Sequence, residues 1–143
     1  MPTRTEIVAE ARTWIGTPYV HQASCLGAGA DCLGLLRGVW RALYGAEPAP
    51  VPAYTWDWSE PDGVERLMAA AVEHLVEERD PRPGSVLIFR MRQSSVAKHI
   101  GILTDASPKR FIHAYTRAGV VEAALSEAWA RRIAGVFAFP ERR

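Results

Sequence analysis

Cysteine is scarce in this chain, and the two that occur, Cys25 and Cys32, are too few for a disulfide framework. Three alternatives remain for this pair: one disulfide bridge, a metal site, or one functional thiol beside one inert thiol. Zinc sites usually contain paired ligands, but no C-x-x-C or H-E-x-x-H element is present. We therefore expect no metal site, although five residues are possible zinc ligands: His21, Cys25, Cys32, His99 and His113.

Charge of one sign and long apolar runs are also lacking. Lysine and arginine total 17 against 16 acidic residues, without blocks of like charge, so we expect no nucleic-acid partner. Residues 1–12 lack the apolar segment of a signal peptide, and no run approaches the roughly 18 apolar residues of a membrane span. We expect no signal peptide, no membrane span, and a single domain over residues 1–143.

Three segments have the apolar spacing of helices, namely 4–15, 32–43 and 64–76. The first follows a capping-box pattern at Thr3 and Glu6, and the second follows Asp31, a residue typical of a helix N-cap. Between the second and third helices, residues 46–62 form an insertion rich in proline that carries Tyr54, Trp56 and Trp58. Proline excludes a helix there, so we predict a surface loop.

The second half of the chain changes to short runs of branched and aromatic residues, which are typical of strands. Helices followed by strands indicate an α+β fold, with the helices packed on an antiparallel sheet of about five strands. The predicted strands are Ser85–Arg90, His99–Leu103, Phe111–Tyr115, Gly119–Ala123 and Gly135–Phe139.

Cys32 is the first candidate for chemistry, because it follows the capping Asp31 at the start of a helix. Unpaired backbone N–H groups and the helix dipole favour a thiolate there and predict a lowered pKa. A small buried core residue is an equally open interpretation of this position. Small neighbours, Gly29, Ala30 and Gly34, favour the first interpretation because they would leave room for a substrate backbone.

A nucleophilic cysteine requires a base, and His99 and His113 both lie within predicted strands. If residues 104–110 form the hairpin loop, residue 99 pairs near 115 and residue 101 near 113. Both histidines then share a face, so that His113 holds one nitrogen of His99 while the other meets Cys32. A register slip of one residue would separate them. His74 is expected to be solvated, and His21 to lie at the surface or contact substrate.

Two further residues are candidates for binding substrate or the oxyanion. Asp31 is explained by its capping role alone, and we assign it no catalytic step. Tyr19, after a Gly-Thr-Pro turn, either donates a hydrogen bond into the site or packs in the core.

Five ordered elements resemble the NlpC-type cell-wall peptidases, a papain-like family: Gly16–Tyr19, Ala30–Leu35, Pro83–Ser85, His99–Ile102 and Phe111–Ala114. The resemblance implies a cysteine endopeptidase that cleaves peptidoglycan stem peptides, commonly between D-glutamate and diaminopimelate, without a cofactor. It implies that Cys32 is the nucleophile, His99 the base, His113 the orienting residue and Tyr19 a residue lining the site. Leu33 and Ser85 depart from the commoner serine and aspartate at these positions.

The resemblance is closest to the branch found in phage tails, prophages and gene transfer agents. It implies delivery in a phage-like particle, made in the bacterial cytoplasm, with tail or baseplate proteins as partners. Two alternatives remain open, namely a structural, wall-binding tail component without turnover and an amidase or acyltransferase on the same fold.

Overall fold

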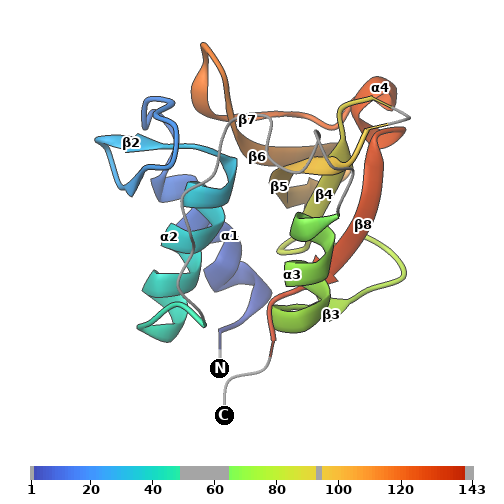
Figure 1. Ribbon diagram of the computed structural model, residues 1–143, viewed down its shortest axis with the longest axis horizontal. Coiled ribbons are helices and arrows are strands. Elements are labelled where there is room, and N and C mark those ends of the chain that lie inside the picture. Colours follow the sequence, from blue (N-terminus) through green and yellow to red (C-terminus); the bar gives the residue numbers. More distant parts are fainter. Residues whose placement is uncertain (1, 49–64, 93–94, 141–143) are drawn as a thin grey trace.

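The computed structural model describes residues 2–48, 65–92 and 95–140, and in it the helices pack against a six-stranded sheet (Figure 1). Within these residues, no helix has the length and apolar character needed to cross a membrane. Tyr54, Trp56 and Trp58 of the predicted insertion lie outside the described residues. The helices are α1 (Arg4–Thr13), α2 (Cys32–Tyr44), α3 (Arg66–His74) and α4 (Glu127–Ala130).

The large sheet has the strand order β3-β8-β4-β5-β6-β7, and every neighbouring pair is antiparallel. This confirms the predicted α+β class. Five strands correspond to the predicted runs, and the two-residue β3 adds a sixth. The strands are β3 (Val76–Glu77), β4 (Val86–Arg90), β5 (Ala97–Ala106), β6 (Lys109–Tyr115), β7 (Gly119–Ala124) and β8 (Ile133–Ala138).

Both faces of the sheet are buried along β4, as its uninterrupted apolar run requires. Val86 and Ile88 face a core shared with α1, α2 and α3, whereas Leu87 and Phe89 face the opposite side. There they form a second cluster with Leu103 and Phe111. The sheet therefore separates a helix-covered core from a second core beneath the β7–β8 connection.

The helix that begins at Cys32 forms as predicted. Asp31 has extended backbone and its Oδ1 accepts a hydrogen bond of 2.7 Å from the N–H of Gly34, which caps α2. Gly45 ends α2 with a φ of 90°, in the left-handed region that favours glycine. Helix α1 has the predicted capping box between Thr3 and Glu6 but ends at Thr13.

The third predicted helix, 64–76, is wrong at its C-terminal end. Leu75 adopts extended backbone, so α3 ends at His74, and Val76 pairs with Ala138 in β3. The helical pattern counted Val72 and Val76 on the apolar face, but both are exposed. The backbone groups of Val76 and Glu77 form their hydrogen bonds with β8 instead of within a longer helix.

Two predicted loops are also shorter than expected. Residues 104–110 belong mostly to strands, because β5 extends to Ala106 and β6 begins at Lys109. The loop between Tyr19 and Ala30 contains a small hairpin of β1 (Ser24–Cys25) and β2 (Gly29–Ala30). This hairpin lies against the start of α2 and forms one side of the site described next.

Candidate active site

Cys32 lies where the start of α2 meets the first part of β5. Its Sγ lies 3.7 Å from the carbonyl oxygen of Lys98 and donates a weak hydrogen bond to it. The backbone N–H of Ile100 also approaches the sulfur. The thiol is therefore in contact with the strand backbone on either side of His99, and its side chain is part-buried.

The expected lowering of the Cys32 pKa is not found. Desolvation by burial, followed by the negative charge of Asp31, raises the pKa of Cys32 to about 12. The backbone N–H groups of Ile100, Leu33 and Cys32 itself lower it, as expected for a helix start, but by less. The thiol is therefore protonated at neutral pH.

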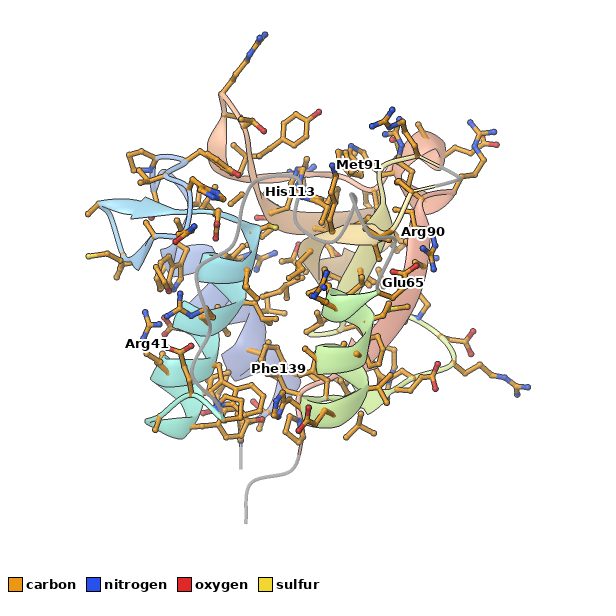
Figure 2. The ribbon with its side chains drawn as sticks, viewed as in Figure 1. Arg41, Glu65, Arg90, Met91, His113 and Phe139 are labelled. Atoms are coloured by element: carbon orange, nitrogen blue, oxygen red, sulfur yellow. The ribbon has the colours of Figure 1, made fainter. Side chains whose placement is uncertain are left out.

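His99 and His113 are joined by a hydrogen bond of 2.8 Å between Nε2 of His99 and Nδ1 of His113. Ile102 pairs with Ile112, and this register places both imidazoles on one face, as predicted. Both side chains are buried, with exposed fractions of 8% for His99 and 3% for His113. Figure 2 shows His113 at the same end of the molecule as Met91 and far from Phe139.

Both imidazoles are neutral at physiological pH. Desolvation, together with the neighbouring His113, lowers the pKa of His99 to about 3. Desolvation lowers the pKa of His113 to about 4. A neutral imidazole pair joined by one hydrogen bond leaves Nδ1 of His99 to accept a proton when Nε2 carries the hydrogen.

A β-bulge precedes His99. Phe89 pairs with His99 while Arg90 pairs with Ala97, so Lys98 is the extra residue on β5. Glu65, at the start of α3, fixes the strand here, because it accepts hydrogen bonds from Arg90 and from the N–H of Ala97. Figure 2 shows the side chains of Glu65 and Arg90 directed toward each other. The bulge and this ion pair set where the Lys98 carbonyl and the His99 ring lie.

Asp31 is buried at the base of the site and holds two backbone groups. Besides capping Gly34, it accepts a hydrogen bond of 2.7 Å at Oδ2 from the N–H of Gln22. Gln22 has a φ of 65°, a conformation that a side chain disfavours. Asp31 thus ties the turn before β1 to the start of α2, and its charge acts on Cys32.

Tyr19 is part-buried and packs against the helix-covered core. Desolvation raises its pKa to about 12, and the charges of Cys32 and Asp31 act in the same direction. The phenol is therefore close to the thiol and protonated, as a hydrogen-bond donor must be. The structure brings Tyr19 and Asp31 together with Cys32.

The small residues near Cys32 do not leave open space for a substrate, contrary to expectation. A Cβ on Gly34 would lie 1.8 Å from the carbonyl oxygen of Ala23, and one on Gly29 would lie 2.6 Å from the Val20 side chain. Ala30 is fully buried. These positions are small because the β1–β2 hairpin packs closely on α2.

The remaining candidates lie away from the thiol or at the surface. His21 is exposed, with its Nδ1 3.8 Å from Oδ2 of Asp31. Cys25 is exposed in β1, so the two cysteines form no bridge. His74 is half-buried beside Glu73 rather than fully solvated. Over the described ranges, no group of three or more histidine, cysteine or acidic residues is arranged to hold a metal ion.

Two neighbours of the site were missed from the sequence. Lys98 contributes a carbonyl because of a bulge, which has no sequence signature here. Trp129 contacts the rings of His99 and His113 from α4, a helix too short to produce a periodic pattern. An isolated tryptophan between two predicted strands was the one available signal.

Known proteins share this arrangement of elements. The chain matches the solved NlpC/P60 domain of the peptidoglycan hydrolase SagA with a TM-score of 0.65 and 20% identity, over 96% of this chain and 100% of that one. It matches a lipoprotein-like NLP/P60 protein of Staphylococcus aureus with a TM-score of 0.62 and 19% identity, over 97% and 42% of the two chains. NlpC1 of Trichomonas vaginalis gives a TM-score of 0.62 and 18% identity, over 97% and 45%.

Sequence comparison gives the same relationship. The chain is 29% identical over 134 residues to the gamma-DL-glutamyl hydrolase of Bacillus subtilis, covering 93% of this chain but 29% of that protein. It therefore spans less than a third of the length of this relative. The model of the NlpC/P60 family matches residues 16–137, which include every candidate site residue. The chain thus belongs to the NlpC/P60 family.

Proposed function

We propose that this chain is a cysteine endopeptidase that hydrolyses peptidoglycan stem peptides, with Cys32 as nucleophile, His99 as base and His113 as the residue that orients the base. The observation that carries the proposal is the hydrogen bond between His99 and His113, with the Cys32 thiol in contact with the backbone on either side of His99. A nucleophile, a base and an orienting group are the parts that covalent acyl transfer requires. Membership of the NlpC/P60 family supports the same assignment.

The first step is attack of Sγ of Cys32 on the scissile carbonyl. Because the thiol is protonated, its proton passes to Nδ1 of His99 as the sulfur–carbon bond forms. The Nε2–H of His99 donates to Nδ1 of His113, and this bond stabilises the imidazolium that results. Backbone N–H groups at the start of α2 stabilise the oxyanion.

The second step releases the two products. The imidazolium of His99 protonates the leaving amine as the carbon–nitrogen bond breaks, which leaves a thioester on Cys32. His99 then takes a proton from water, whose oxygen attacks the thioester carbonyl. The thiol regains its proton, and the acid product departs. Tyr19 is proposed to donate a hydrogen bond to the substrate or the oxyanion. Asp31, first a candidate for the same role, is buried with both carboxylate oxygens on backbone N–H groups, so its proposed role is to hold the start of α2.

The bond that we propose is the one between D-glutamate and diaminopimelate. The relative in Bacillus subtilis is a gamma-DL-glutamyl hydrolase, and the fold neighbour SagA is a peptidoglycan hydrolase. The first name supports a glutamyl bond, and the second supports peptidoglycan as the substrate. The products of digestion identify the bond directly.

Mass spectrometry of purified peptidoglycan after digestion tests this function. We expect fragments that end in D-glutamate and matching fragments that begin with a free diaminopimelate amine. Cleavage between the lactyl group and L-alanine would identify an amidase instead, and transfer products would identify an acyltransferase. Binding to the wall without any product would identify a structural component and overturn the proposal.

We propose further that the protein acts in the tail of a phage-like particle, which brings it to the wall from outside, with tail or baseplate proteins as partners. Support comes from the motif Ala30–Leu35, in which Leu33 follows the cysteine as in that branch of the family. Neighbouring genes for tail proteins, and the protein's presence in purified particles, are the expected observations. A gene without such neighbours, and particles without the protein, would contradict this setting.

A further inference from the structure

Trp129 covers the histidine pair from the second face of the sheet. Its ring centroid lies 5.5 Å from that of His99, with 31° between the planes, and 5.0 Å from that of His113, with 80° between the planes. The indole is therefore tilted against the ring of His99 and makes a T-shaped contact with the ring of His113. Both histidines are almost completely buried, whereas Trp129 is part-buried and reaches the surface.

The indole is itself fixed on several sides. It packs edge-on against Phe89 at 5.3 Å and against Phe111 at 5.5 Å, and these two side chains belong to the second core. Ser126 caps α4 by accepting a hydrogen bond from the N–H of Trp129. The guanidinium of Arg132 lies 5.4 Å from the indole centroid, at cation–π distance. The ring is thereby held between the histidine pair and a surface cation.

We propose that Trp129 is a positioning residue that covers the hydrogen bond between His99 and His113 and keeps water away from it. The inference rests on the proposed function, because it concerns how the base of that reaction is held. Water reaching the pair would compete for Nε2 of His99 and for Nδ1 of His113, and would free the His99 ring to rotate. With the indole in place, the His99 ring keeps the one orientation that its hydrogen bond to His113 sets.

The cover also determines the charge of the pair, since exclusion of water disfavours the imidazolium. Burial is the first cause of the lowered pKa of both histidines. Several polar and titratable groups lie around the pair or next to its strand. Tyr115 on β6 contacts both imidazole rings, and Arg132 carries a positive charge beyond the indole. On the other side of His99, Cys32 contacts the backbone of Lys98 and Ile100, and Asp31 and Tyr19 lie next to Cys32.

Trp129→Ala, Trp129→Phe and Trp40→Ala test the proposal. Trp40 is a matched control, because it is also part-buried but packs on Tyr44 and Phe139, at the end of the molecule opposite His113 (Figure 2). Nitrogen-15 NMR follows the protonation of each imidazole, with signals assigned from His99→Gln and His113→Gln. In parallel, the pH profile of kcat/KM is measured on muropeptides.

In Trp129→Ala we expect the titration midpoints of both histidines to rise by about one pH unit or more, a tenfold change in proton affinity. The acid limb of the pH profile should move in the same direction, and kcat at neutral pH should fall about tenfold because the base is less well oriented. Trp129→Phe keeps an aromatic ring and should restore most of both properties. Trp40→Ala should leave the midpoints and the pH profile unchanged.

Unchanged midpoints in Trp129→Ala, or equal shifts in Trp40→Ala, would overturn the proposal. If Trp129→Ala does not fold, Trp129→Leu is measured instead, with the same expected directions. If the wild type hydrolyses no muropeptide, the proposed function fails, but the imidazole titration still decides whether Trp129 covers the pair.

Discussion

Nε2 of His99 and Nδ1 of His113 lie 2.8 Å apart, on two neighbouring strands and away from water. A bond between two neutral imidazoles needs one hydrogen, and the nitrogen that carries it decides what His99 does. When Nε2 of His99 is the donor, Nδ1 has a free lone pair and is a base. When Nδ1 of His113 is the donor, Nδ1 of His99 carries hydrogen and cannot take the proton of Cys32.

The first prediction concerns this tautomer. We expect nitrogen-15 NMR to show hydrogen on Nε2 of His99 and none on its Nδ1. His113→Asn supplies an amide oxygen as acceptor and should keep part of the activity, whereas His113→Ala should lower kcat/KM roughly 100-fold, the lower range for acid–base catalysis. Equal activities of the two variants would show that the acceptor at residue 113 is irrelevant.

A second prediction follows from the raised pKa of Cys32. A thiol with a pKa of about 12 gains thiolate about tenfold for each pH unit between neutral pH and pH 9, so its alkylation by iodoacetamide should rise steadily without levelling. The measurement needs Cys25→Ser, because the exposed Cys25 also reacts. The double variant that also carries Cys32→Ala gives the background. A plateau near neutral pH would instead indicate a preformed thiolate and imidazolium.

The buried histidines should also make stability depend on pH. Their pKa values lie below the ordinary 6.5, so the unfolded chain takes up protons that the folded chain excludes. The contribution of these two histidines to the free energy of unfolding is therefore greatest above pH 6.5. It decreases as pH falls, by up to about 1.4 kcal/mol per pH unit for each histidine. Urea unfolding between pH 7 and 5 measures it.

The range between pH 7 and 5 distinguishes the effect of the histidines on stability from that of the carboxylates. The carboxylates with lowered pKa values contribute mainly below their ordinary value of 4.5, and they are Glu47, Glu65, Glu78 and Glu122. In His99→Gln combined with His113→Gln, the loss of stability between pH 7 and 5 should largely disappear. A wild-type free energy of unfolding that is flat over this range would contradict buried neutral imidazoles.

Asp31 provides a fourth prediction. Asp31→Ala removes the cap of α2 and the acceptor for Gln22, and should lower the free energy of unfolding by about 2 kcal/mol. Asp31→Asn retains one carbonyl oxygen and should be destabilised less. It also removes the charge that raises the Cys32 pKa, so alkylation of Cys32 should become faster at a given pH.

The control for Asp31 is Thr3→Ala, which removes the N-cap of α1, away from the site. It should lower stability by about 1 kcal/mol and leave alkylation unchanged. If Asp31→Asn and Thr3→Ala alter alkylation equally, the effect of Asp31 on the thiol is not electrostatic.

Much of this site was predictable from local pattern. The spacing from Cys32 to Leu43 and the N-cap residue Asp31 identified α2, because both depend on neighbours in sequence. The strand runs located His99 and His113, and hairpin symmetry placed their rings on one face. The bulges at Lys98 and Thr104 shift the register without separating the two histidines.

The predictions that were wrong concern features that depend on contacts between segments distant in the sequence. Val76 leaves α3 because β8 offers it a partner, and Gly34 is small because Ala23 packs against it. The direction of the Cys32 pKa shift reflects burial at the junction of α2 and β5, which outweighs the helix start. Trp129 contacts the site from the second face of the sheet. The predicted fold placed helices against the sheet but included no second core on its other face.

The central claim, that Cys32 is the nucleophile of a peptidoglycan hydrolase, is tested most directly by the amount of product released from purified muropeptides by the wild type and by folded Cys32→Ala. Because Cys32 forms the covalent intermediate, we predict cleavage by the wild type and no product above background from Cys32→Ala. Equal release by the two proteins would contradict the account.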